Sequence, residues 1–210
     1  MNNLTNLESS IDPDKSKNII KLALDLTQKN AIDILFKYLK DNQIYPELLI
    51  NNVGISHYGN FVGCKTSEFQ SIIDLNIVSF TNLTHKYLNY MNGHKAAILN
   101  VASTYAFRSA ENQAVYAASK SYIYSLSRSL RKELAKSGIR ISVFCPGKIN
   151  TDFDEHSGKA AIINSNRKGI SAEFAAKYAI DAMNDGKFMI IPGILRRTLR
   201  FLYQIFPTTF

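Results

Sequence analysis

The sequence predicts an α/β fold in which a parallel sheet is covered by helices on both faces. Short, continuously apolar segments recur along the chain, and each is followed by a segment in which apolar residues recur at helical spacing. The alternation is regular from residue 18 to 191, so we expect one domain over 1–193 and a separate helix over 194–210. With 210 residues, of which 46% are hydrophobic and 20% charged, the chain can bury a sizeable core.

The expected elements follow from the apolar runs and the residues that interrupt them. The strands are Asn18–Leu24, Leu48–Ile50, Ala96–Val101, Arg140–Phe144 and Phe188–Ile191. The helices cover about 30–42 with Thr27 as the N-cap, Ser67 to about Met91 with a break allowed inside it, the residues from Tyr116 to just before Gly138, and 171–184. Runs this short and this apolar are typical of strands buried on both faces.

Polar residues follow four of the strands at their carboxyl ends. They are Asp25, the turn Asn51-Asn52-Val53-Gly54, Ser103, and the pair Pro146-Gly147. Parallel strands end at the same edge of a sheet, and open α/β sheets bind their ligands at that edge. The sequence therefore predicts a ligand site built from these strand ends.

Tyr116 and Lys120 are four residues apart on one expected helix, so both lie on the same helical face. A phenol is a poor proton donor or acceptor at neutral pH, and a nearby cation favours its ionised form. Such a pair can move a proton on or off an oxygen atom. Tyrosine and lysine at this spacing are also common by chance. The polar residues at the strand ends are what favour a functional pair here.

Composition and charge exclude several classes of function. The net charge of +8 is mostly scattered, which indicates a solvated basic surface rather than a nucleic-acid site. Cys64 and Cys145 lie far apart and the four histidines form no ligand motif, so the sequence predicts reduced thiols and no metal site. Residues 1–14 are polar and no apolar run is long enough to span a bilayer, so we expect a cytoplasmic protein.

The motifs together resemble the classical short-chain dehydrogenase/reductase family, over about residues 19–193. The resemblance is carried by Asn51-Asn52-Val53-Gly54 (the family usually has alanine at Val53), Asn76, Ser103, Tyr116-x-x-x-Lys120, and Pro146-Gly147 with Thr151 beyond it. It implies a Rossmann-type doubly wound sheet and a hydride transfer between NAD or NADP and a carbonyl or alcohol. The choice between the two cofactors and the identity of the substrate are not readable from this chain.

The resemblance also implies a role for each matching residue. Tyr116 would be the general acid or base, Lys120 would lower its pKa and bind the nicotinamide ribose, Ser103 would polarise the substrate oxygen, and Asn76 would hold a water in a proton relay. The residues implied to bind the cofactor are Asp25, Asn51, Asn52, Gly54, Tyr116, Lys120, Pro146, Gly147, Ile149 and Thr151. Taken singly, Ser103 could instead cap a turn, Asn76 could bond within its helix, Asp25 could mark a helix entry, and Pro146-Gly147 could be an ordinary turn.

The family's opening segment has no counterpart in this sequence. The family begins with a strand, a glycine-rich turn that binds the pyrophosphate and a second strand, whereas the first glycine here is Gly54. Those two strands would lie between Asn18–Leu24 and Leu48–Ile50, so the sequence predicts an N-terminally truncated sheet. Residues Asn3–Ile11 would be the tail of a preceding helix, and the chain would be a fragment or begin at a start codon assigned too late. The alternative is a non-catalytic remnant or binding module unable to hold the dinucleotide.

The last segment and the partners are predicted less directly. Residues 194–206 alternate apolar residues with arginines at helical spacing, which suits either an anionic membrane surface or packing on this domain or a second subunit. The family resemblance implies a homo-oligomer that pairs through the helices of Asn76 and Tyr116. The substrate lid would be Asp154–Gly169, a short polar stretch without a diagnostic residue.

Overall fold

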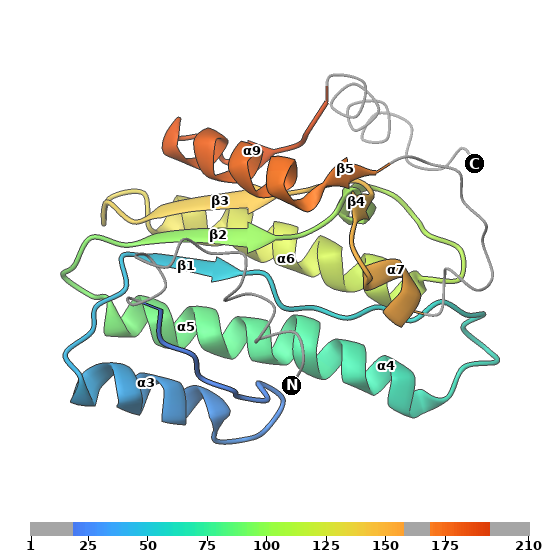
Figure 1. Cartoon of the computed structure of the whole chain (residues 1–210), viewed down its shortest axis with the longest axis horizontal. Helices are drawn as coiled ribbons and strands as arrows, with labels where there is room; N and C mark the ends of the chain where they lie inside the picture. The colour runs from blue at the N-terminus through green and yellow to red at the C-terminus, as the bar shows by residue number, and fades with distance from the viewer. Residues whose placement is uncertain (1–18, 158–168, 194–210) are drawn as a thin grey trace.

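A computed structural model describes residues 19–157 and 169–193, which form an α/β fold around a parallel sheet (Figure 1). The four strands of the main sheet lie in the order β1 (Leu48–Asn51), β2 (Ala97–Val101), β3 (Arg140–Phe144) and β6 (Met189–Ile190), and all neighbours are parallel. The fold class predicted from the alternating pattern is confirmed. So are the strands expected between residues 48 and 191, within about two residues at each end.

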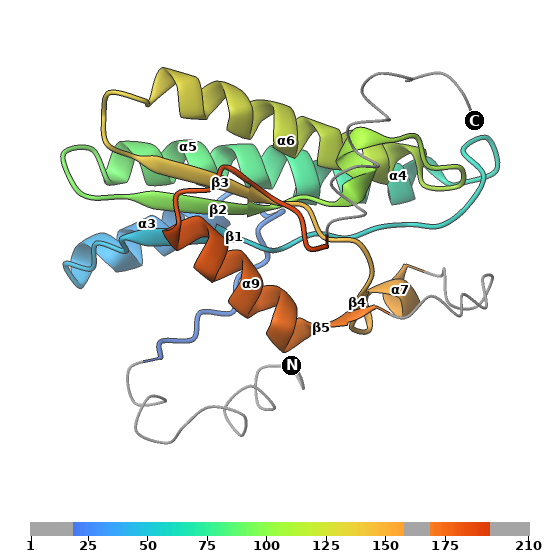
Figure 2. The same cartoon turned by 90° about the horizontal axis from the view of Figure 1, so that it is seen from above.

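Helices cover the sheet on both faces (Figure 2). On one face lie α4 (Thr66–Ile73), α5 (Phe80–Tyr90) and α6 (Ala114–Glu133), while α9 (Ala172–Asn184) lies on the other. Successive side chains of β2 point to opposite faces of the sheet, so that Ile98 packs with α5 and the next residue, Leu99, packs with α9. Both side chains are essentially fully buried. In the described part of the chain, no helix is long and apolar enough to cross a membrane.

The long helical segment after residue 66 contains the break that the sequence allowed. Between α4 and α5 the chain forms a π-helix, η1, over Asp74–Ser79, so the helix continues with a wider, underwound turn. A π-helical turn rotates the residues inside it relative to a regular α-helix, and such turns are frequent at functional sites. Asn76 lies within this turn.

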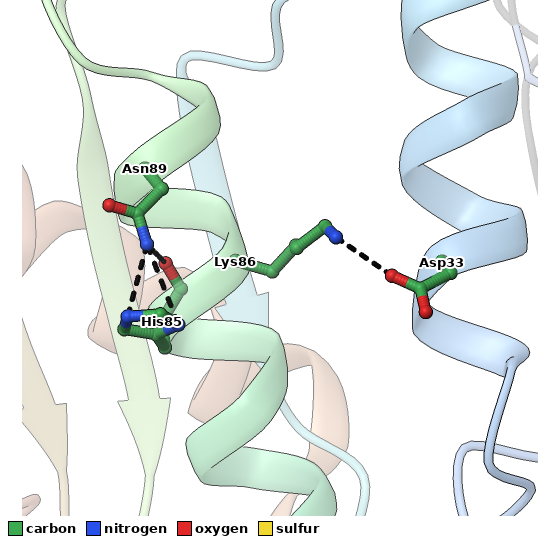
Figure 3. Close-up of polar contacts among 4 residues, drawn as sticks. All are labelled: Asp33, His85, Lys86 and Asn89. Carbon is green, nitrogen blue, oxygen red and sulfur yellow. Dashed lines mark hydrogen bonds and ion pairs between the residues drawn. The ribbon is translucent and has the colours of Figure 1, made fainter.

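The helix α3 (Ala31–Asp41) packs along α5 at the β1 side of the sheet (Figure 1). Its Phe36 joins Leu83 and Tyr87 of α5 in one buried cluster. At the surface, the ammonium of Lys86 donates to the carboxylate of Asp33 at 2.7 Å and links the two helices (Figure 3). The neighbouring Asn89 bonds within α5, to the carbonyl oxygen of His85 at 3.0 Å, and so adds nothing to this docking.

The strand predicted over Asn18–Leu24 is wrong for the described residues 19–24, which form no regular structure. Ile19, Ile20 and Leu22 are 40%, 57% and 41% exposed. A strand needs a partner for its N–H and C=O groups, and no described strand pairs with the outer edge of β1. Thr27 is likewise not an N-cap, because α3 begins at Ala31 and the Thr27 hydroxyl donates to Asp25 instead.

Two short strands were not predicted. Residues Ile149–Asn150 (β4) and Ile170–Ser171 (β5) form a separate parallel pair beside the short helix α7 (Phe153–His156). A short 3-10 helix, η2 (Thr104–Phe107), follows β2. The predicted helix tail over Asn3–Ile11, most of the expected lid and the C-terminal helix over 194–210 lie outside the described residues.

Candidate active site

The carboxyl ends of β1, β2 and β3 meet at one edge of the sheet, as the sequence predicts. Two backbone hydrogen bonds continue the pairing beyond the last strand residues. The Ala102 N–H donates to the Phe144 carbonyl oxygen at 2.8 Å, and the Thr104 N–H donates to that of Pro146 at 2.9 Å. These bonds hold Ser103, which lies between the two donors, beside Pro146.

Tyr116 and Lys120 enter this edge from the first turns of α6, and both side chains are buried, at 7% and 4% exposure. The Lys120 ammonium lies 5.6 Å from the centre of the Tyr116 ring and donates to the carbonyl oxygen of Val101 at 3.0 Å. The last residue of β2 therefore fixes the position of the cation. The predicted pairing of a phenol with a positive charge is present in the structure.

Burial lowers the pKa of Lys120 from 10.5 to about 8, because removal from water penalises the charged ammonium. The Cys145 thiol, which follows β3, acts in the opposite direction and favours the charged form. Lys120 is thus mostly protonated at neutral pH and loses its proton just above it. A buried amine poised in this range is typical of sites that move protons.

Asn76 fixes the chain that leads away from β1. Its side-chain oxygen accepts the Ile55 N–H at 2.9 Å, and its amide nitrogen donates to the Ile55 carbonyl oxygen at 2.8 Å and to the Ser119 hydroxyl at 3.1 Å. The side chain is 1% exposed, so these bonds satisfy a fully buried amide. Asn76 therefore joins the π-helix, the β1 loop and α6 at a point one residue before Lys120.

Gly54 passes close to both polar groups. A Cβ atom at this position would lie 3.2 Å from the Asn76 side-chain oxygen and 3.3 Å from the Lys120 nitrogen. Only a residue without a side chain leaves that space open. Gly54 thus places the β1 loop directly beside Asn76 and Lys120, the two residues that the family resemblance connects in a proton relay.

The Ser103 hydroxyl accepts the Tyr105 N–H at 3.2 Å and so caps η2, the turn-capping role that the sequence left open. This bond occupies one acceptor position, and a hydroxyl can still donate its proton elsewhere. The Tyr105 ring packs edge-on against Tyr116, with the ring centres 5.9 Å apart, and the ring centre of Phe153 of α7 lies 5.8 Å from that of Tyr116. Aromatic rings thus restrict how the Tyr116 ring can tilt.

The predicted cofactor residues fall into two groups. Pro146, Gly147, Ile149 and Thr151 follow β3 at the same edge as Tyr116, with the Thr151 hydroxyl accepting the Phe153 N–H at 3.4 Å. On the β1 side, Asn52 is exposed. Asp25 is also exposed and accepts hydrogen bonds from Thr27 and Gln28, which hold the pKa of its carboxyl below the usual value.

The side-chain amide of Asn51 bonds to residues inside the fold. Its amide nitrogen donates to the Asn100 side-chain oxygen at 2.8 Å and to the Thr84 hydroxyl at 3.1 Å, and Asn100 in turn donates to the Ser127 hydroxyl at 2.8 Å. Asn100 and Ser127 were not predicted to belong to the site. A polar residue inside an otherwise apolar strand run, AILNV, was the available signal. This network ties β1, β2 and α6 together beneath the site.

Two hollows flank the site. One is lined by Tyr116 together with His57, Phe61, Phe69 and Gln113. The other lies along β1 and is lined by Leu26, Ile50, Asn52 and Val53. Tyr116 thus lines the first hollow, and the second lies at the β1 side of the sheet.

Comparison with known proteins is consistent with this arrangement. Residues 2–179 match the family model described as short chain dehydrogenase. Carbonyl reductase family member 4 of Xenopus laevis is 31% identical over 135 residues, which are 64% of this chain and 57% of that protein. The chain spans 57% to 59% of the length of the first curated relatives that it matches.

Solved structures of low sequence identity share the fold. A short-chain dehydrogenase from Sphingobium yanoikuyae, in complex with NADPH, aligns with a TM-score of 0.77 at 23% identity, over 94% of this chain and 78% of that one. A 4-hydroxyisoleucine dehydrogenase complexed with NADH aligns with a TM-score of 0.70 at 24% identity, over 82% and 79% of the two chains. The Rossmann-like arrangement of the sheet and helices is therefore confirmed.

Proposed function

The chain belongs to the short-chain dehydrogenase family, and on that premise we propose that it transfers a hydride between a nicotinamide cofactor and a carbonyl or alcohol substrate. The observation that carries this proposal is the buried pair of Tyr116 and Lys120 at the carboxyl edge of the sheet, with the cation 5.6 Å from the phenol ring. The solved relatives in complex with NADPH and with NADH support either NADP or NAD as the cofactor.

The residues at this edge suit the nicotinamide end of such a cofactor. Lys120 and Thr151 offer donors there, and Pro146 and Gly147 follow β3 at the same edge. When bound, the nicotinamide ring supplies or accepts the hydride. The adenosine end would face the β1 side, where Asn52 and the apolar hollow along Ile50 and Val53 offer fewer polar contacts. In the described part of the chain, no glycine-rich turn opens a helix at this edge.

The protein's own part in the reaction is to hold an oxygen and to move a proton. In the direction of reduction, the Ser103 hydroxyl donates a hydrogen bond to the substrate oxygen as negative charge develops there. Tyr116 then gives its proton to that oxygen, and the Lys120 ammonium stabilises the phenolate that remains. Asn76 and Gly54 keep the β1 loop against Lys120, and a water held there by Asn76 would return the proton. In the direction of oxidation, Tyr116 takes the proton.

The experiment is transfer of an isotope label. The chain is incubated with NADH or NADPH carrying deuterium at the transferable position and with a panel of ketones and aldehydes, and the alcohols are analysed by mass spectrometry. We expect one deuterium in the product alcohol with at least one cofactor. A folded chain that binds neither cofactor and yields no labelled alcohol across the panel would instead favour the alternative, a non-catalytic remnant or binding module unable to hold the dinucleotide.

The same family membership leads us to propose a homo-oligomer. The outer surfaces of η1, α5 and α6 lie side by side, joined by a 2.9 Å bond between the Thr81 and Tyr122 hydroxyls, and Val78 is 46% exposed there. Light scattering coupled to size-exclusion chromatography measures the oligomeric state directly, and a monomer would contradict the proposal.

The predicted contact of 194–206 with a membrane calls for co-sedimentation with anionic vesicles.

A further inference from the structure

The loop that forms one wall of the Tyr116 hollow brings together three side chains with metal-binding donors. They are His57 in the chain after β1, Cys64 just before α4, and Glu68 in the first turn of that helix. One donor atom from each lies within 4.8 Å of the other two. We propose that His57, Cys64 and Glu68 bind a divalent transition-metal ion of the zinc class, beside the candidate active site.

The distances suit such an ion with little movement. Zinc bonds of about 2.0 Å to nitrogen or oxygen and 2.3 Å to sulfur place tetrahedral ligand atoms roughly 3.3 to 3.6 Å apart. The His57 ring nitrogen Nε2 and the Glu68 oxygen Oε2 are already 3.4 Å apart. Because the three donor atoms lie within 4.8 Å of one another, the Cys64 sulfur needs to approach its two neighbours by no more than roughly 1.5 Å.

Gly59 makes this approach possible. A Cβ atom at position 59 would lie 2.8 Å from the Cys64 sulfur, closer than real Cβ atoms come, and 3.0 Å from the His57 Nε2 atom, which is tighter than most contacts. The Gly59 N–H donates to the Asn112 carbonyl oxygen at 2.9 Å, which holds this part of the loop in place. The backbone at Gly59 thus leaves a space that the sulfur and the imidazole both face.

Other hydrogen bonds already orient the ligands. The Glu68 oxygen Oε2 accepts the Lys65 N–H at 3.0 Å, as a residue three positions into a helix often does, and a carboxylate retains further acceptor positions. The Cys64 N–H donates to the Asn60 carbonyl oxygen at 3.1 Å, and the Asn60 side chain accepts the Val62 N–H at 3.0 Å. Bonds of this kind, from outside the ligand set, commonly fix metal ligands in proteins.

The donor set defines the kind of ion. One imidazole, one thiolate and one carboxylate are borderline ligands that suit zinc or cobalt better than magnesium or calcium. Three protein ligands leave one coordination position for water or a substrate oxygen. The side chains of His57 and Glu68 are 32% and 35% exposed, so an ion can enter from solvent. Binding converts the Cys64 thiol to a thiolate and releases one proton.

Cobalt(II) titration of the full chain, in a reducing agent that does not bind metals, tests the site. We expect a near-ultraviolet sulfur-to-cobalt absorption band that saturates at one ion per chain and is displaced by zinc. Cys64→Ser removes the band although Cys145 is retained, and His57→Gln and Glu68→Gln each weaken binding by more than about tenfold. His85→Gln, on an exposed turn of α5, is the matched control and leaves binding unchanged.

A second readout keeps the proposal testable if a variant is less stable. Zinc should raise the melting temperature of the wild-type chain and of His85→Gln, but not that of Cys64→Ser, because only a bound ion shifts the folding equilibrium. Absence of the cobalt band in the wild type, or a band and a zinc-dependent melting shift that both survive Cys64→Ser, would overturn the proposal. Neither readout depends on oxidoreductase activity.

Discussion

The two sides of β1 are built very differently. Beyond its carboxyl end, toward β2 and α6, Asn76, Ser103, Tyr116 and Lys120 are all less than 9% exposed, and hydrogen bonds from neighbouring elements hold the amide of Asn76 and the ammonium of Lys120. Beside its outer edge, the apolar residues of 19–24 form no strand and are mostly half exposed. Both regions were predicted from the same kind of pattern, a short apolar run followed by polar residues.

The difference shows what each kind of pattern depends on. The site residues lie on elements that contact one another directly, β1, β2, η1 and α6, so their positions follow once those elements pack. A strand over 19–24 would depend on a paired neighbour, and among the described residues none lies beyond β1. An apolar run therefore forms a strand only where a neighbouring strand is available to pair with it.

A large loss of stability is expected in the site when the Asn76 side chain is removed. Asn76→Ala removes the three bonds that join the β1 loop to α6 and leaves buried polar groups without partners, which should lower the free energy of unfolding by about 3 kcal/mol. Urea unfolding followed by circular dichroism measures it. Asn89→Ala, on the exposed side of α5, is the control and should cost less than about 1 kcal/mol. Equal losses in the two variants would remove the distinction between the regions.

A substitution at Lys120 is expected to raise the free energy of unfolding rather than lower it. The lowered pKa means that burial of the ammonium costs about 3 kcal/mol at neutral pH. Lys120→Met relieves this cost but loses the bond to the Val101 oxygen, so we expect a net gain of about 2 kcal/mol at pH 7 together with loss of activity.

The pH dependence provides the check on that cost. Below about pH 8 both folded and unfolded wild-type chains hold the Lys120 proton, and the cost is full. Between about 8 and 10.5 the folded chain releases the proton while the unfolded chain keeps it, so wild-type stability rises with pH. The advantage of Lys120→Met should shrink across this window. An advantage that is constant from pH 7 to 10 would show that the ammonium is not buried.

A small effect is expected in the segment beside β1. Ile20→Ser should change the free energy of unfolding by less than about 0.5 kcal/mol, because the side chain is 57% exposed. The comparison is Ile98→Ala in β2, where the side chain is 0% exposed and the expected loss is about 4 kcal/mol. A loss above about 1 kcal/mol at Ile20 would mean that the segment packs more firmly than its exposure indicates.

The smallest effect is expected at the ion pair between α3 and α5. Both side chains are about half exposed or more, so Lys86→Ala should cost less than about 0.5 kcal/mol despite the 2.7 Å contact with Asp33. The buried contact of Phe36 with Leu83 and Tyr87 holds the helices together instead. Thermal unfolding in low and high salt tests this, and a marked loss of stability at high salt would contradict it.

Much of the fold could be predicted from local sequence. The run RISVF begins at the charged Arg140 and is followed by Cys145-Pro146, and β3 has the predicted bounds, Arg140–Phe144. Ser171 caps α9 through the Phe174 N–H, which places that helix within one residue of its predicted start. Such elements are marked by residues at their own ends, so no knowledge of their neighbours is needed.

The rest depends on contacts between segments that are distant in sequence. The π-helical turn at Asn76 is compatible with the same apolar spacing as an α-helix, so the pattern shows only that a break is tolerated. Asn51 reads as a ligand contact by its position after a strand, yet it bonds to Asn100, 49 residues away. His57, Cys64 and Glu68 follow no familiar ligand spacing, and the loop fold at Gly59 brings them together.

The central claim, that Tyr116 moves the proton in a hydride transfer, is tested most directly by paired phenylalanine variants. The oxidation of NADH and NADPH by the active carbonyl compound is followed for wild type, Tyr116→Phe and Tyr124→Phe, of which the last alters a tyrosine on the same helix that packs against Phe107 and Phe188. We predict that Tyr116→Phe lowers the rate by about 100-fold or more and that Tyr124→Phe leaves it nearly unchanged. A Tyr116→Phe chain that is folded and as active as the wild type would contradict the account.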